Sequence, residues 1–137
     1  MRRRRPDRRT AIVPVDLRAR LEQARLETLA LLRALDQAAL APRDLPHPAL
    51  ATLAALDADC GEALWALDHP RAALDRDAMV RDTLASLDAL ADARAQVRLG
   101  VPAAWRPRLQ TLEPLIRVTL DPREAYNDLP GADPRNR

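Results

Sequence analysis

The side chains best suited to chemistry in this chain are its one cysteine and its two histidines. Cys60 lies in the stretch DADCGE, where three acidic neighbours suggest a nucleophile or a metal ligand. However, leucines stand four and seven residues away on both sides of Cys60, which places the thiol in the middle of one apolar helix face. A thiol buried there behaves as a small apolar group with a raised pKa and little reactivity. We therefore expect Cys60 to serve core packing.

The two histidines stand at junctions between segments. His47 lies in LPHP and His69 in LDHP, and a chain with one cysteine and two histidines offers no set of four nitrogen and sulfur ligands for zinc. Asp68 beside His69 is the best candidate acid–base pair, but no nucleophile or second acid is evident near it. The sequence also contains no glycine-rich phosphate loop, GxSxG or HExxH motif. We expect no metal, no cofactor and no catalysis, with an enzyme built on Asp68 and His69 as the minor alternative.

The strongest charge in the chain lies in its first ten residues. MRRRRPDRRT carries six arginines and one aspartate, a net charge of +5, so a chain with a formal charge of +2 has a net −3 on the rest. A segment of this kind has no apolar face and is expected to be disordered on its own. It could bind nucleic-acid phosphates, with an affinity that falls steeply with salt and disappears when residues 1–9 are deleted. The alternative is a leader that only aids solubility. The arginines concerned are Arg2, Arg3, Arg4, Arg5, Arg8 and Arg9.

The composition predicts the elements that hold these residues. Alanine and leucine dominate the apolar residues, phenylalanine is absent and only three glycines occur, which favours helices packed on helices. Apolar periodicity, prolines and caps predict helices at about 17–40, 48–68, 76–98 and 103–120. Asp16 and Asp75 stand where N-caps belong, Gly100 where the third helix ends, and two prolines predict that the fourth is bent.

These helices predict an all-α fold, an antiparallel bundle of three to four helices. Residues 1–13 form the disordered arginine-rich arm, 14–120 the bundle domain, and 121–137 a short turn and a polar tail. The rival architecture is a helical repeat, because the pattern LxxLD recurs as LRALD at 32–36, LAALD at 53–57, LWALD at 64–68 and LASLD at 84–88. The flanking residues do not align, so we interpret the pattern as two core-facing leucines with an aspartate at the edge of the stripe.

Four features predict a partner-binding surface on the bundle. They are a second apolar line on the first helix, a tryptophan directed away from the core, an arginine inside an apolar stripe that must reach solvent or a carboxylate, and an apolar pair beside a Pro-Gly turn. The residues are Leu26, Leu29 and Leu40, then Trp65, then Arg94, and finally Tyr126 and Leu129. The alternative is that the first helix is central and buried on two sides, and that Trp65 closes the core under a linker.

Together these features favour a non-enzymatic interaction or adaptor protein that binds a protein partner or itself. The alternative is a nucleic-acid-binding accessory protein that uses its arginine-rich arm. No apolar run approaches the roughly 18 residues that a membrane-spanning helix needs, and a single cysteine cannot form an internal disulfide. We therefore expect a cytoplasmic protein without a membrane partner.

Overall fold

The computed structural model describes residues 16–69 and 75–121, and within them the chain is helical and contains no strand. The α-helices are α1 (Leu17–Gln37), α2 (His47–Asp68), α3 (Arg76–Gly100) and α4 (Arg106–Thr119), with short 3₁₀ turns at η1 (Pro42–Asp44) and η3 (Ala103–Trp105). None of the helices in this part of the chain is long and apolar enough to cross a membrane. The predicted arm, and the predicted tail beyond residue 121, lie outside the described residues.

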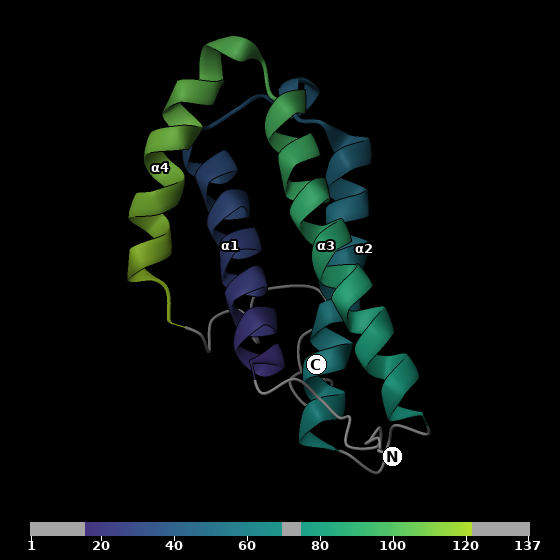
Figure 1. The fold of residues 1–137 in the computed structure, drawn as a ribbon. Helices are drawn as coiled ribbons and strands as arrows, with labels where there is room; N and C mark the ends of the chain where they lie inside the picture. The colour runs from purple at the N-terminus through teal and green to yellow at the C-terminus, as the bar shows by residue number, and fades with distance from the viewer. Residues whose placement is uncertain (1–15, 70–74, 122–137) are drawn as a thin grey trace, which may run out of the picture.

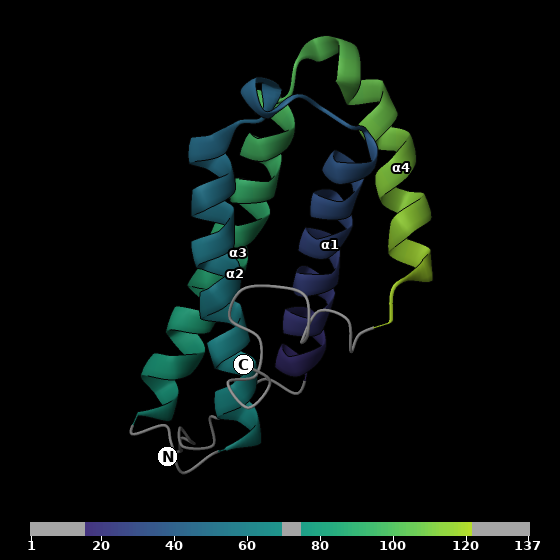
Figure 2. The same ribbon diagram turned by 180° about the vertical axis from the view of Figure 1, so that it is seen from behind.

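The helices form the antiparallel bundle that the sequence predicts. Each helix runs opposite to the one before it, and α1 lies between α4 on one side and the α2–α3 pair on the other (Figures 1 and 2). α4 packs chiefly on α1 and touches α3 much less. The seam between α3 and α4 is therefore the least closed side of the bundle.

The core is built from the apolar stripe predicted on the first helix. All six residues of that stripe are buried, namely Leu17, Leu21, Ala24, Thr28, Leu31 and Leu35. The five apolar members of the stripe join buried residues of the other helices in one cluster, which includes Leu53, Leu90 and Leu109. Burying a leucine completely contributes about 1.5–3 kcal/mol to folding, so this cluster holds the four helices together.

The predicted helices differ from the structure by two or three residues at three places: the end of α1, the end of α3, and the start of α4, where residues 103–105 form η3 instead. α1 ends at Gln37 instead of about residue 40, because Ala39 has a φ of 55° that reverses the chain. This left-handed conformation costs a residue other than glycine about 1–2 kcal/mol. Asp16 precedes α1 but makes no side-chain cap, whereas Asp75 caps α3 as predicted by accepting a hydrogen bond from the Ala78 N–H at 2.9 Å.

α3 extends through Gly100, two residues further than predicted. A Cβ atom added to Gly100 would lie 2.5 Å from the Cβ of Pro46, the residue that precedes α2. Carbon atoms pack at about 3.5–4.0 Å. Gly100 is therefore required for the close approach of two segments, rather than for ending the helix by a left-handed turn.

α4 continues through Pro114, and the ribbon bows gently along its length (Figure 1). Pro114 is exposed, as expected for a proline tolerated on the outer side of a helix. Because proline has no N–H, the carbonyl of Gln110 lacks its usual donor one turn later. The predicted stripe of this helix is buried at Leu109 and Ile116.

Candidate functional site

The most buried charged groups of the bundle form an ion pair that sequence reasoning missed. Arg25 of α1 and Asp57 of α2 are both 0% exposed, and the guanidinium donates from Nε to Oδ1 at 3.2 Å and from Nη2 to Oδ2 at 2.8 Å. Burial raises the pKa of Asp57, although Arg25 acts in the opposite direction. The available signal was that Arg25 has leucines four residues away on both sides, at Leu21 and Leu29. The pair joins two helices and does not face solvent.

Arg94 is used inside the bundle rather than at a partner surface. It is 8% exposed, and Nη2 donates to Glu27 Oε1 at 3.2 Å. Nη1 donates to the Ala24 carbonyl at 3.2 Å and to Thr28 Oγ1 at 3.3 Å. Burial lowers the pKa of Arg94. The sequence predicted that Arg94 reaches either solvent or a carboxylate, and its ion pair with Glu27 confirms the carboxylate. Its predicted place on a partner-binding surface is not confirmed, because the side chain is buried.

Cys60 lies in the core as predicted. It is 0% exposed, and burial together with the nearby Asp57 carboxylate raises the pKa of its thiol to about 11. The thiolate is the reactive form of cysteine. At neutral pH Cys60 is therefore protonated and inert.

Each of the two histidines has a ring nitrogen within hydrogen-bond distance of a backbone carbonyl oxygen. His47 Nε2 lies 2.8 Å from the Pro42 carbonyl oxygen. His69 Nδ1 lies 2.8 Å from the Trp65 carbonyl oxygen, and the two rings are stacked with centroids 4.1 Å apart. Asp68 forms an ion pair with Arg18. In the described parts of the chain, no three His, Cys, Asp or Glu side chains are grouped so that they could hold a metal ion.

The second apolar line of the first helix is not a surface. Leu26 and Leu29 are each 4% exposed, and Leu40 is partly buried against the core. α1 is enclosed by helices on two sides (Figure 1), so the alternative of a central first helix is the correct one. Trp65 is partly buried beneath its stacked partner His69. Tyr126, Leu129 and the arginines of the arm lie outside the described residues.

The exposed apolar face of the described bundle lies on α4 instead. Leu115 is 60% exposed and Val118 is 78% exposed. At about 100° per residue they share the outer third of the helix with three other exposed, uncharged residues. We call this set the α4 strip; it consists of Pro107, Thr111, Pro114, Leu115 and Val118. The sequence signal was that Leu115 and Val118 fall off the stripe that holds Leu109 and Ile116.

Arginines flank the α4 strip on both sides. Arg108 is exposed on one side, and Arg106 and Arg117 lie on the other. Arg106 donates from Nε to the Val101 carbonyl at 3.1 Å and from Nη2 to the Leu99 carbonyl at 2.8 Å, which ties the start of α4 to the end of α3. Arg117 donates from Nη2 to Oε1 of Gln23 in α1, and its buried Nε has no hydrogen-bond partner.

Next to the α4 strip, two adjoining pockets open at the seam between α3 and α4. The larger has a volume of about 330 Å³ and the smaller about 180 Å³. Together we call them the seam groove. The larger pocket is lined by Arg98, Leu99, Arg106, Leu109, Gln110, Glu113 and Pro114, and the smaller adds Glu27, Ala30 and Arg117. Leu99 is 60% exposed, and Pro114 belongs both to the groove and to the α4 strip.

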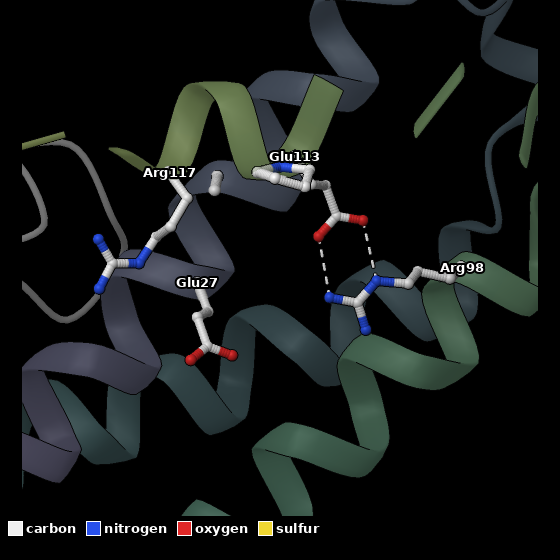
Figure 3. A pocket seen from close by; sticks show the side chains of 6 residues that line it. Glu27, Arg98, Glu113 and Arg117 are labelled. Atoms are coloured by element: carbon white, nitrogen blue, oxygen red, sulfur yellow. Dashed lines mark hydrogen bonds and ion pairs between the residues drawn. The ribbon is translucent and has the colours of Figure 1, made fainter. Parts of the chain in front are cut away.

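A bidentate ion pair crosses the groove. Figure 3 shows Arg98 of α3 and Glu113 of α4 pointing toward one another, with Glu27 and Arg117 on the other side of the smaller pocket. Arg98 Nε and Nη2 each donate to a Glu113 carboxylate oxygen at 2.9 Å, and this raises the pKa of Arg98. Because Glu113 is held by Arg98 and its side chain is only 14% exposed, its charge is compensated within the chain.

The α4 strip and the seam groove form one surface with apolar contact area and a charged border. Surfaces of this composition bind apolar side chains and exclude water from them. Comparison with models of protein families, with curated proteins and with solved structures gives no match to this chain. Its function is therefore inferred from this surface.

Proposed function

We propose that this protein is a helical interaction protein that binds a protein through the α4 strip and the seam groove. The observation that carries the proposal is the exposure of Leu115 at 60% and Val118 at 78% on a strip without charge. The strip continues through Pro114 into the groove, where Leu99 is also exposed. Apolar surface gathered in one place favours association, since burying about 100 Å² of it contributes about 2.5 kcal/mol.

The side chains with the most reactive chemistry support an interaction role over a catalytic one. The Cys60 thiol is buried with a pKa of about 11, so it is a poor nucleophile at neutral pH. Asp68 is paired with Arg18, while His69 is stacked on Trp65. Asp68 and His69, the candidate acid–base pair, therefore each interact with a different residue rather than with each other.

Site-specific crosslinking in cells tests this function. Val118 is replaced by p-benzoylphenylalanine, and the control places the same photoreactive residue at Ala51, an exposed position of α2. We expect discrete crosslinked products from position 118 that are absent at position 51, identified by mass spectrometry. Adding Leu115→Asp should abolish them without unfolding the bundle, because substitutions at exposed positions change stability by only about 0.5 kcal/mol. Identical products from both positions would contradict the proposal.

The charge of residues 1–10 favours a second, separable activity. Six arginines and one aspartate in ten residues can neutralise several phosphates of RNA or DNA without reading sequence. Deleting residues 1–9 should then remove salt-sensitive retention on an immobilised homopolymeric RNA, while leaving the crosslinks from position 118 intact. Retention that survives the deletion would contradict this activity.

A further inference from the structure

We infer that the occupant of the α4 strip and the seam groove is an amphipathic helix of a partner protein with acidic residues beside its apolar face. This inference rests on the proposed function and adds the chemistry of the partner. The apolar face of that helix lies along the α4 strip, and one large apolar side chain enters the seam groove. Its acidic residues face the arginines that border this surface.

Charge complementarity selects an acidic partner. Four arginines border the surface, at Arg98, Arg106, Arg108 and Arg117, and two acids line the groove, Glu113 and Glu27. The four arginines and Glu113 together carry a net charge of +3. Glu27 at the far end of the groove does not change this sum, because it is paired with Arg94. Such an excess steers anionic groups to the surface and opposes cationic ones.

The same arginines disfavour a second copy of this chain as the occupant. The α4 strip has Arg108 on one flank and Arg106 and Arg117 on the other. If two copies paired through this strip, in either direction, arginine flanks would meet arginine flanks. Like charges set against each other across an interface cost several kcal/mol. A heterologous partner with carboxylates at those positions removes this repulsion.

The shape of the surface favours a helix. From Pro107 to Val118 the strip follows eleven residue steps of α4, about 16 Å at 1.5 Å per residue, or three turns of an opposing helix. The described bundle has no strand edge to which an extended peptide could be added. The larger pocket, about 330 Å³ with Leu109 and Pro114 among its lining residues, has room for one large apolar side chain. That side chain would also cover Leu99.

Selection from a displayed library of helical peptides on the full-length protein tests this inference. We expect enriched peptides to carry apolar residues at i, i+3, i+4 and i+7, one of them large, with Asp or Glu beside them. One enriched peptide is then synthesised with a fluorescent label, and its affinity is measured by anisotropy. Val118→Asp and Leu99→Asp should each abolish binding, and circular dichroism should show that both variants are folded.

Reversing one charge at the border of the surface tests whether the partner is acidic, independently of where it binds. Arg108→Glu should weaken the peptide at least about tenfold, or about 1.4 kcal/mol. The matched control Arg81→Glu makes the same charge change at an exposed position near the start of α3. It should alter affinity less than about twofold, as expected for a charge outside the contact.

The outcomes distinguish this inference from the proposed function. Enriched peptides could require Val118 yet carry no excess of acidic residues, or could bind the Arg108→Glu variant as tightly as wild type. Either result contradicts the inference that the partner is acidic, but not the proposed binding site. A chain that forms dimers by light scattering, and loses them with Val118→Asp, also overturns the inference, because the occupant is then a second copy. Enriched peptides that bind Val118→Asp as well as wild type overturn both proposals.

Discussion

Burial determines the chemistry of the titratable side chains in the bundle core. Burial is the largest influence on three of them, because it disfavours the charged form: it raises the pKa of Asp57 and Cys60 and lowers that of Arg94. Cys60 shows this most simply, because its thiol forms no ion pair, and its pKa moves from 9.0 to about 11. Its titration therefore reports on folding.

The free energy of unfolding should fall as the pH rises from about 9 to about 11. In this window the unfolded chain releases the Cys60 proton while the folded chain retains it, so the folded state binds more protons and is destabilised by raising the pH. The loss amounts to about 2–3 kcal/mol. Urea unfolding at several pH values measures it.

The composition makes this measurement unusually clean. All 22 basic residues are arginine, so Cys60 and Tyr126 are the only side chains that ordinarily titrate between pH 8 and 11. Cys60→Ala keeps Tyr126 and removes the thiol. If the pH slope of this variant equals that of wild type, the assignment to Cys60 is wrong.

Sequence reasoning succeeded at residues whose role follows from one helix alone. The position of Cys60 on an apolar face and the cap at Asp75 depend only on local spacing, and both are confirmed. The Arg25–Asp57 pair joins residues 32 apart, and its formation depends on how two helices rotate against each other. LAALD at 53–57 thus differs from the other copies of the pattern: its aspartate is buried, whereas Asp36, Asp68 and Asp88 are exposed.

At the scale of the helices, the sequence predicted where the elements lie and which stripe of the first helix faces the core, but not which apolar side chains stay exposed. Prolines and apolar periodicity gave the four helices to within three residues at each end. The larger differences lie at the end of α1, where Ala39 has a φ of 55°, at the end of α3, which continues to Gly100, and at the start of α4, which follows the 3₁₀ turn η3. The α4 strip was missed because the exposed side of α4 depends on its packing on α1 and its weak contact with α3.

Gly100→Ala should destabilise the bundle by about 1–3 kcal/mol, the usual cost of inserting a methyl group into a packed contact. The new Cβ would stand 2.5 Å from the Cβ of Pro46, and a proline ring cannot rotate away. A double-mutant cycle with Pro46→Gly, followed by thermal unfolding, separates the clash from effects on helix propensity. Since Pro46→Gly removes the opposing atom, the double variant should be more stable than the two single losses predict. Simple additivity would refute the clash.

At the scale of the whole molecule, the Arg25–Asp57 pair connects α1 to α2 inside the core, and both side chains are 0% exposed. Removing one partner leaves the other charge buried and uncompensated. Arg25→Met or Asp57→Leu alone should therefore lower the free energy of unfolding by about 3–5 kcal/mol.

The double variant with Arg25→Met and Asp57→Leu should recover most of this loss, because an apolar pair avoids the desolvation of two charges. Denaturant unfolding of the three variants measures both effects. A double variant as unstable as the worse single one would show that the pair contributes more than its own desolvation cost.

The packing of α1 against α4 also governs the order in which the bundle can be completed. Arg117 donates a hydrogen bond to Gln23 across 94 residues of sequence, so the first and last described helices are neighbours. On the ribosome, α1 emerges well before α4 is made, and such long-range contacts cannot form until synthesis reaches the last helix. A chain released prematurely after α3 would therefore leave one side of α1 uncovered and prone to aggregation, which makes truncations in this region targets for chaperones and proteases.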